Sequence, residues 1–342
     1  MVGIYTTGFN GIDPFVLRFE QILQFNNIES VRLSLDDPDF WKKLEQISLF
    51  IYRWEFSDYD KQLAKTIMPI IERKGILCFP NQETSWHYDD KIKQYYLLKE
   101  FNLPYTESYV FWSKSSALDW IMQAQFPVVF KLKGGAGSKN VKLIKKKKTA
   151  RRIVKRMFGK GKMPNTIDRN KINLIGEVKH LLAKFERKLR GGAAIDNWQK
   201  EKDYVLFQKY LPDNEYDTRV TVIGNRAFAF RRKVRSKDFR ASGSGIIEYK
   251  RENINLDAIK VAFETSKKLK FQSMAYDFLF NEMGNPEFCE ISYTYVDTAI
   301  YNCPGYWDQD LNWHEGHYWP QYFILVDLLG VENLKQPQIE IS

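Results

Sequence analysis

The first ninety residues alternate short apolar segments with amphipathic ones, and this alternation restricts the possible folds more than any other feature. The segments VGIYTT, SVRLSL, ISLFIYRW and Gly75–Phe79 are typical of strands. Between them, residues 13–26 and 58–73 have apolar positions at helical spacing, and Asp13 can cap the first helix. ISLFIYRW is apolar enough to be a central strand. Because strands that alternate with helices form parallel sheets, we predict a small parallel α/β domain for residues 1–90.

A glycine-rich hairpin is predicted for residues 126–145, FPVVFKLKGGAGSKNVKLIK. Two strand patterns flank a tip that contains Gly134, Gly135, Gly137 and Ser138. The tip is not a P-loop, because a strand follows it instead of a helix, and the third glycine of the dinucleotide fingerprint is absent. Glycines let backbone N–H groups approach an anion closely, and Lys131 would add a fixed charge beneath them. The hairpin is therefore either a phosphate-binding loop or an ordinary flexible turn.

Three later segments contain the residue types that a nucleotide and metal site requires. YVLFQKYLPDNEYDTRV (204–220) offers a strand and a hinge for the adenine edge, then acids for ribose hydroxyls. FAFRRKVRSKDFRASGSG (228–245) places arginines, which suit phosphates and carboxylates, near a second Gly/Ser loop. MAYDFLFNEMGNPEFCEIS (274–292) predicts a hairpin with Asp277 and Glu290 on its two strands. Magnesium bound to ATP needs only such a small number of protein carboxylates.

This order of segments resembles the ATP-grasp superfamily, in particular its glutathione synthetase and ribosomal-protein glutamate ligase type. The resemblance covers roughly residues 80–300 and lies in DDKIKQYYLLKEFNLPYTES, VVFKLKGGAGSKNVKLI, LFQKYL, EYDTRV, FRASGSG and the 274–292 hairpin. It implies an α/β (α+β) chain, in which an ATP-grasp fold follows the small parallel α/β domain. The implied domains are 1–90, a lid subdomain 91–210 with a basic helical insertion at about 145–202, and a C-terminal subdomain 211–335 with the metal hairpin and an aromatic tail.

The resemblance also implies ATP and Mg²⁺ as cofactors and assigns roles to residues. The implied nucleotide-binding residues are Lys91, Lys131, Gly134, Gly135, Gly137, Ser138, Gln208, Lys209, Tyr210, Leu211, Glu215 and Asp217. The implied metal site comprises Asp277, Glu290 and Ser292, and the implied catalytic residues are Arg219, Arg231 and Arg240. Lys91 and Arg231 are also compatible with ordinary surface positions, and Glu290 with a surface acid at a strand end.

Two positions depart from the family pattern. Ser292 stands where the family has a metal-binding asparagine, and Ser242 stands where the family has another asparagine after the arginine. Serine is a poorer magnesium ligand than asparagine, so the sequence supports a second metal less than the first.

Enzymes of this type use ATP to phosphorylate a carboxylate, and an amine then attacks the acyl phosphate. The resemblance therefore predicts an ADP-forming carboxylate–amine ligase, and we predict a sugar acid or amino acid of surface-polysaccharide biosynthesis as its substrate. One alternative is an ATP-grasp kinase that phosphorylates a hydroxyl group. The other is a non-catalytic nucleotide-fold protein that binds an anionic polymer or a membrane surface.

Residues 301–322 are crowded with Trp and Tyr, which can stack on a ring-shaped saccharide substrate or simply pack under a helix. The predicted substrate residues are Arg53, Trp86, His87, Tyr293, Trp307, Asp308 and Trp313. Arg53 is included because ligands collect at strand ends in α/β sheets. The segment His314-Glu-Gly-His317 lacks the spacing of the HExxH zinc motif.

Basic residues far outnumber acidic ones between 131 and 202, whereas the rest of the chain has more acidic than basic residues. This segment is a solvated surface, a site for an anionic membrane, or a site for nucleic acid. Nucleic acid has the least support, because no RNA- or DNA-binding motif accompanies the charge. Scattered cysteines, no secretory signal and no long apolar stretch indicate a cytoplasmic protein, which the basic segment can attach peripherally to a membrane. The oligomeric state stays open, and a dimer is compatible with the sequence.

Overall fold

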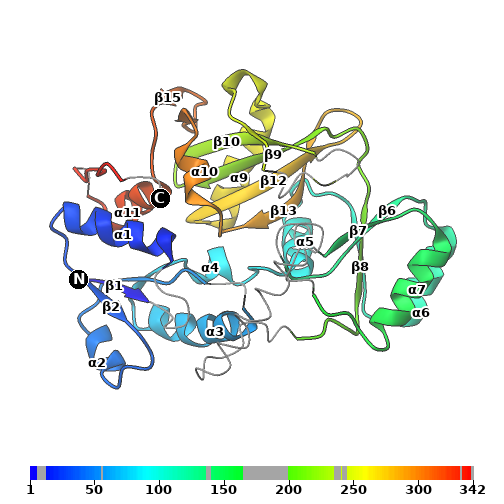
Figure 1. Cartoon of the computed structure of the whole chain (residues 1–342), viewed down its shortest axis with the longest axis horizontal. Helices are drawn as coiled ribbons and strands as arrows, with labels where there is room; N and C mark the ends of the chain where they lie inside the picture. The colour runs from blue at the N-terminus through cyan, green and yellow to red at the C-terminus, as the bar shows by residue number, and fades with distance from the viewer. Residues whose placement is uncertain are drawn as a thin grey trace, which may run out of the picture. The chain divides into compact units, whose positions relative to one another are not determined.

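The computed structural model describes residues 1–5, 13–54, 57–135, 140–164, 199–234, 240, 245–331 and 333–339. The chain divides into two compact units, which are described separately below (Figure 1). Unit 1 consists of Met1–Glu55, Asp60–Tyr88 and Asn214–Ser342, and unit 2 of Phe56–Tyr59 and Asp89–Asp213.

The N-terminal part of unit 1 contains a four-stranded parallel sheet, as the alternating segments predict. Its strands β1 (Val2–Tyr5), β2 (Ser30–Leu33), β3 (Leu49–Ile51) and β4 (Leu77–Phe79) pair in the order β2-β1-β3-β4. The accompanying helices are α1 (Pro14–Phe25), α2 (Phe40–Leu44), α3 (Asp58–Arg73) and α4 (Gln82–Ser85). The carboxylate of Asp13 accepts a hydrogen bond from the Phe15 N–H and begins α1, which confirms the predicted cap.

Unit 1 also contains a seven-stranded sheet in which each hydrogen-bonded pair is antiparallel. It comprises β9 (Tyr216–Ile223), β10 (Arg226–Lys233), β11 (Ile247–Glu248), β12 (Ser273–Phe280), β13 (Pro286–Ser292), β14 (Gly305–Trp307) and β15 (Trp313–Glu315). The strand order is β13-β12-β9-β10-β14-β15, and β11 pairs with β10. The predicted β12–β13 hairpin is confirmed, and β9 and β10 form a second hairpin across Gly224 and Asn225. The β14–β15 hairpin was not predicted, because its strands have only three residues each.

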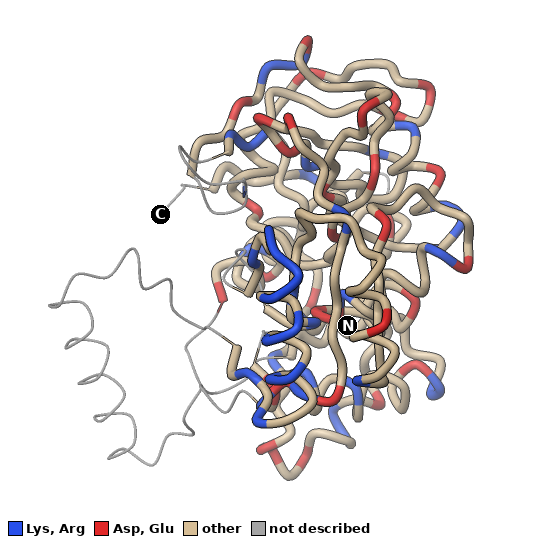
Figure 2. Tube along the Cα trace, turned by 90° about the vertical axis from the view of Figure 1, so that its right-hand side faces the viewer, with Lys and Arg blue, Asp and Glu red and all other residues tan. Residues whose placement is uncertain are grey.

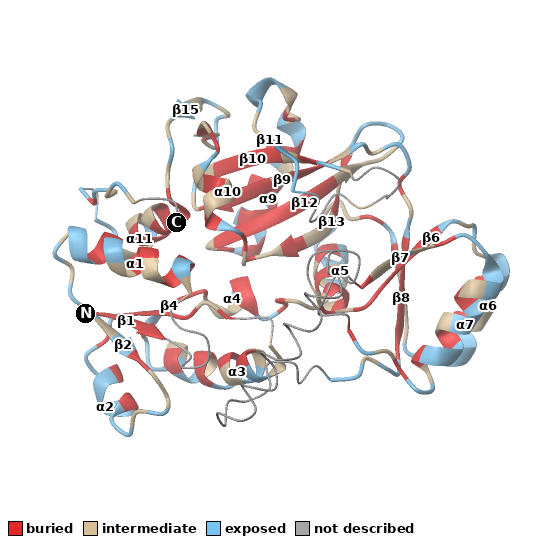
Figure 3. Cartoon of the chain, viewed as in Figure 1, coloured by how far each residue is buried: buried red, intermediate tan, exposed pale blue. Residues whose placement is uncertain are grey.

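The two faces of this sheet have different partners within unit 1. Helix α9 (Leu256–Leu269) contacts β9, β10 and β12. Phe228 and Phe230 of β10 join a hydrophobic core with Ile4 and Ile51 of the parallel sheet and with Trp319. This core also includes α11 (Pro320–Leu329), while the remaining short elements are α10 (Asp297–Tyr301) and a 3₁₀ turn at Arg251–Asn253. Figure 3 shows buried positions along β9, β10 and β12, so these strands form a rigid base for the side chains at their ends.

Unit 2 is built on a four-stranded antiparallel sheet with the order β5-β8-β6-β7. Its elements are α5 (Lys91–Glu100), β5 (Ser108–Phe111), α6 (Lys114–Gln123), β6 (Val128–Lys131), β7 (Val141–Ile144), α7 (Lys147–Met157) and β8 (Val205–Lys209). The pairing of β6 with β7, which sets Lys131 opposite Val141, confirms the glycine-rich hairpin. Helix α7 lies at the start of the predicted basic helical insertion, of which residues 165–198 lie outside the described residues.

None of the described helices is both long enough and apolar enough to cross a bilayer.

Candidate functional site

The base of the glycine-rich loop in unit 2 holds one of the predicted nucleotide lysines directly. Lys91 is the first residue of α5, and its backbone N–H donates to the Lys133 carbonyl at 2.9 Å. Its ammonium group donates to the Gly135 carbonyl at 3.0 Å. Lys131 ends β6 two residues before Lys133, and both Lys91 and Lys131 are 7% exposed. The fold therefore places Lys91 against the loop that Lys131 introduces.

Asp89 binds the same loop through its carboxylate. Its carboxylate accepts a hydrogen bond from the Gly135 N–H at 2.7 Å. Gly135 has φ +100°, and a Cβ atom there would lie 2.5 Å from the amide nitrogen of Asn140. The loop therefore requires glycine at this position. Asp89 received no role in the sequence prediction, although the Asp-Asp-Lys segment was part of the resemblance; Gly137 and Ser138 lie outside the described residues.

Tyr204 and Glu201 support the loop base from the segment before β8. The Lys133 N–H donates to the Tyr204 hydroxyl at 2.8 Å, and that hydroxyl donates to Glu201 at 3.0 Å. Burial, reinforced by the charge of Glu201, raises the pKa of Tyr204 well above its ordinary value, so the hydroxyl stays protonated and able to donate. Neither residue was predicted, because nothing in the local sequence pairs position 204 with position 133.

The predicted adenine hinge follows β8. Gln208 is buried, and its side-chain amide donates to the Ser108 hydroxyl at 3.1 Å, so this amide joins the neighbouring strands β8 and β5. Lys209 is exposed, and its backbone N–H donates to the Glu107 carbonyl at 2.8 Å. Tyr210 is half-buried and Leu211 is buried. The contacts of Lys209, Tyr210 and Leu211 with a nucleotide stay predictions.

Four charged side chains of unit 1, Asp217, Arg219, Arg232 and Asp277, form what we call the buried ion cluster. Arg219 donates through Nε and Nη2 to the carboxylate of Asp277 at 2.6 and 2.8 Å. Arg232 donates to Asp217 at 2.7 and 2.5 Å and also contacts Asp277 at 2.8 Å. Strand pairing sets Asp217 opposite Arg232 and Asp277 opposite Arg219, so all four side chains share one face of the sheet.

The protonation states of this cluster follow from burial and from its balanced charges. Burial opposes ionisation of Asp277, but Arg219 and Arg232 outweigh it and hold the pKa of Asp277 well below its usual range. Burial raises the pKa of Asp217 more than its pairing with Arg232 lowers it, and the negative charge of Asp277 raises this pKa further. Burial also opposes the charge of Arg232, yet both carboxylates together raise its pKa.

Two residues predicted to contact the nucleotide or the reacting groups are paired with other side chains in this structure. Asp217 was expected to hold ribose hydroxyls, but its carboxylate is 6% exposed and is bound by Arg232. Arg231 was expected beside Arg219, but side chains alternate along a strand, so it points to the opposite face from Arg232. There it pairs with Glu248 at 2.6 Å and lies 4.3 Å from the ring centre of Tyr216.

Glu215 and Arg240 keep their predicted roles as predictions. Glu215 is exposed, and its carbonyl accepts a hydrogen bond from the Val234 N–H at 2.8 Å. Arg240 is half-buried, and its neighbours on both sides lie outside the described residues.

The three predicted metal ligands lie near one another on β12 and β13. Asp277 is paired directly with Glu290, and Ser292 follows two residues later on the same face. The hydroxyl of Ser292 donates to the Thr294 carbonyl at 3.0 Å and accepts from the Thr294 N–H at 3.2 Å, so it closes a local turn. Among the described residues, no group of three or more His, Cys, Asp or Glu side chains is arranged to hold a metal ion.

Three of the predicted substrate residues are buried and pack against neighbouring side chains. His87 is wholly buried, and its ring centre lies 5.2 Å from that of Phe271. The Tyr293 hydroxyl accepts a hydrogen bond from the Trp54 N–H at 2.9 Å within an aromatic cluster. Trp307 is 3% exposed. Their apolar surfaces pack within the fold, and their contact with a substrate stays a prediction.

The other predicted substrate residues are mostly engaged with neighbours as well. Arg53 pairs with Asp13 and donates to the Tyr295 carbonyl at 3.2 Å. Asp308 accepts from the Asn312 N–H and lies 2.8 Å from His314 Nε2, which closes its loop and lowers its pKa. Half-buried Trp313 packs edge-on against Trp307 with ring centres 4.6 Å apart, whereas Trp86 is exposed.

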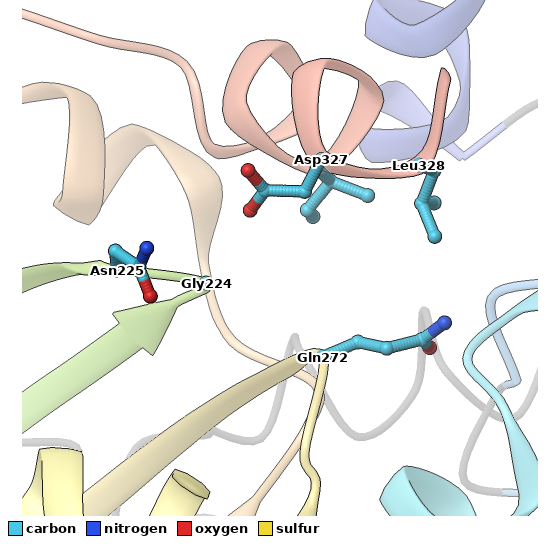
Figure 4. Close-up of a pocket in the computed structure, with 6 residues that line it drawn as sticks. Gly224, Asn225, Gln272, Asp327 and Leu328 are labelled. Carbon is cyan, nitrogen blue, oxygen red and sulfur yellow. The ribbon is translucent and has the colours of Figure 1, made fainter. Parts of the chain in front are cut away.

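A separate cavity of about 310 Å³ opens in unit 1 at the β9–β10 turn (Figure 4). It is lined by Gly224, Asn225, Gln272, Ile324, Asp327 and Leu328. Gly224 lies seven positions after Asp217, which corresponds to about 23 Å along an extended strand. The cavity is therefore at the opposite end of the sheet from the buried ion cluster, and none of the predicted site residues lines it.

Comparisons with protein-family models and with curated protein sequences find no match. The structure, however, is similar to solved structures. A RimK-domain ATP-grasp protein from Sphaerobacter thermophilus is 12% identical with a TM-score of 0.52, covering 87% of this chain and 93% of that chain. The D-cycloserine synthetase DcsG is 14% identical with a TM-score of 0.54, covering 85% of this chain and 91% of that chain. A biotin carboxylase from Campylobacter jejuni is 12% identical with a TM-score of 0.59, covering 98% of this chain and 72% of that chain.

Proposed function

The chain has the ATP-grasp fold, and we propose from this premise that it is an ATP- and Mg²⁺-dependent ligase that joins a carboxylate to an amine and releases ADP. The observation that carries the proposal is the base of the glycine-rich loop. Lys91 and Lys131 are nearly buried there, and Asp89 and Lys91 both bind Gly135. Lysine ammonium groups beneath backbone N–H groups are suited to bind phosphate oxygens.

The proposed roles of the chain's residues follow from this arrangement. Lys91 and Lys131 bind the phosphates of ATP, and the loop that begins at Gly134 covers them and excludes water from an acyl phosphate. Arg219, the most exposed member of the buried ion cluster, binds the transferring phosphoryl group or the acyl phosphate. Bound Mg²⁺ would neutralise the charge on the phosphate oxygens.

The substrate is proposed only as a class. A sugar acid or an amino acid of surface-polysaccharide biosynthesis was predicted, and the aromatic segment 301–322 was a candidate stacking surface for a saccharide. Because Trp307 and the Asp308 loop serve packing and turn formation, that segment no longer favours a saccharide over an amino acid. A substrate screen therefore includes both kinds of carboxylate.

The proposal is tested by titrating a non-hydrolysable ATP analogue calorimetrically, with and without Mg²⁺. We expect binding that requires Mg²⁺ and that weakens at least tenfold in Lys131→Met. Lys142→Met is the matched control, because Lys142 lies on the same hairpin but is exposed. With a pool of carboxylates and amines, ADP release should require both. AMP as the product, or no binding to the wild-type protein, would contradict the proposal.

A kinase is the second candidate. Ser292 replaces the metal-binding asparagine of the family pattern, and its hydroxyl donates to the Thr294 carbonyl, so this site departs from that of the ligases. The same assay separates the two reactions. A ligase makes no stable product without the amine, whereas a kinase makes a stable phosphorylated product that added amines leave unchanged.

A further inference from the structure

Asp277 occupies the position of a magnesium ligand in the family pattern, yet its surroundings are those of a carboxylate that holds arginines. Its Oδ1 accepts from Arg219 Nε at 2.6 Å. Its Oδ2 accepts from Arg219 Nη2 at 2.8 Å and also lies 2.8 Å from Arg232 Nη2. Both oxygens therefore contact cationic donors.

The positive charges around Asp277 disfavour a divalent cation at this carboxylate. Two guanidinium groups lie within hydrogen-bond distance, and the Asp277 side chain is only 7% exposed, so solvent screens their repulsion of a cation weakly. A metal ion that binds Asp277 would have to displace at least one arginine and leave its charge in a buried environment.

Strand pairing makes such a displacement difficult. Arg232 is anchored at its other carboxylate, Asp217, by two hydrogen bonds, and its side chain is 10% exposed. Arg219 is paired with Asp277 on the adjacent strand, so the bidentate bond follows from the sheet itself. This bond uses Nε and Nη2 of Arg219 and leaves the Nη1 edge directed away from Asp277.

We propose that Asp277 is a positioning residue that holds Arg219 and Arg232 as a fixed guanidinium pair for an anionic group, and that it does not bind magnesium. This inference rests on the proposed function, because it concerns the same nucleotide and metal. Glu290 and the phosphate oxygens of the nucleotide then hold the metal. The anionic group is a carboxylate or a phosphoryl group, both of which match the geometry of arginine.

The test replaces Mg²⁺ with Mn²⁺ and measures Mn²⁺ affinity by electron paramagnetic resonance in the presence of the ATP analogue. We expect Glu290→Gln to weaken Mn²⁺ binding at least tenfold and Asp277→Asn to weaken it less than threefold. Glu248→Gln, which removes the partner of Arg231 outside the cluster, is the matched control and should change nothing. An Asp277→Asn effect as large as that of Glu290→Gln would overturn the proposal.

A second measurement needs no change at Asp277 and covers the case in which Asp277→Asn does not fold. The Arg219 Nε–H resonance is followed by nitrogen NMR in the wild-type protein and is identified by its loss in Arg219→Lys. We expect slow solvent exchange of this proton that persists when Mg²⁺ and the ATP analogue are added. Fast exchange after the metal is added would show that the arginine leaves Asp277, and would overturn the proposal.

The two measurements also separate this inference from the proposed function. If the wild-type protein binds no nucleotide, the proposed function fails. The Arg219 resonance is then followed with Mg²⁺ alone, because Mn²⁺ bound at Glu290 would lie close enough to broaden it whether or not Asp277 binds the ion. Slow exchange that persists with Mg²⁺ supports the role of Asp277, and fast exchange overturns that role.

Discussion

Asp277 is the residue whose ionisation the fold controls most clearly. Burial alone would raise its pKa, but Arg219 and Arg232 bring it well below the ordinary value. A carboxyl group with a lowered pKa in the folded state stabilises the fold at pH values above its unfolded pKa of about 3.9. This stabilisation is lost as the pH falls from that value through the folded pKa.

Replacing Asp277 with Asn should therefore have a cost that depends on pH. At pH 7 we expect the free energy of unfolding to fall by about 3–5 kcal/mol, because buried Arg232 and partly buried Arg219 lose a charged partner. At pH 3 the cost should be about 1 kcal/mol smaller. The contribution of Asp277 to wild-type stability falls by about 1.4 kcal/mol for each pH unit between its unfolded pKa and its folded pKa. Urea unfolding at both pH values measures this. Asp257→Asn, at an exposed carboxylate, is the control; an Asp277→Asn cost that grows at pH 3 would contradict the prediction.

Gly135 should tolerate no side chain. In Gly135→Ala, the Cβ would lie 2.5 Å from Asn140 in a backbone with φ +100°. We expect a loss of about 1–3 kcal/mol in stability and weaker binding of the ATP analogue, because the loop base must shift. Thermal unfolding and calorimetry measure the two effects. Gly75→Ala is the control: it has φ +81° with open space around it, so it should lower stability without changing nucleotide affinity. Unchanged nucleotide affinity in Gly135→Ala would count against the loop's role.

At the scale of elements, the N-terminal cap of α5 connects helix stability with the position of Lys91. The Asp90 carboxylate accepts from the backbone N–H groups of Ile92 and Lys93 at 3.1 and 3.2 Å. These bonds fix the first turn of the helix, where Lys91 is the first residue.

Asp90→Ala should therefore lower both the stability and the affinity for the ATP analogue. We expect a loss of about 1 kcal/mol in the free energy of unfolding, which is typical of a lost cap. Asn255→Ala removes the equivalent cap of α9, where Asn255 accepts from the N–H groups of Asp257 and Ala258. It should cost a similar amount without changing nucleotide affinity. Equal effects of both variants on affinity would show that the α5 cap has no special link to the nucleotide.

The elements themselves could be predicted from the sequence, because their signals are local. The β6–β7, β9–β10 and β12–β13 hairpins and the parallel sheet follow from apolar periodicity and turn residues, and the predicted ATP-grasp fold is confirmed. The partners of charged residues could not be predicted in this way. Arg232 reaches both Asp217 and Asp277 only because of the pairing between strands, and the apolar surroundings of His87 come from distant segments.

At the scale of the whole molecule, charge is distributed unevenly. No Asp or Glu occurs between Leu132 and Ile167. Figure 2 views the molecule from the side of α7, whose turns carry Lys and Arg. Ala150, Val154 and Met157 of this helix are buried in the core of unit 2, so its apolar face is not available for insertion into a bilayer. The exposed face can bind an anionic surface by electrostatic attraction alone.

We propose that this face binds anionic membranes and expect the protein to sediment with vesicles that contain phosphatidylserine at low salt, but not with neutral vesicles. Lys148, Arg152 and Lys155 are exposed and lie at helical spacing. Changing all three to Glu should weaken binding at least a hundredfold, since each basic residue near the surface contributes about 1 kcal/mol.

The control changes Lys260, Lys267 and Lys268 of α9 to Glu, which alters the net charge equally. If both triple variants lose binding equally, net charge alone is responsible; if the protein binds single-stranded DNA but not the vesicles, the partner is a nucleic acid. The membrane contact would be placed on α7 if only the α7 variant loses vesicle binding while its affinity for the ATP analogue is unchanged. Vesicle binding of the wild-type protein should also be lost at high salt.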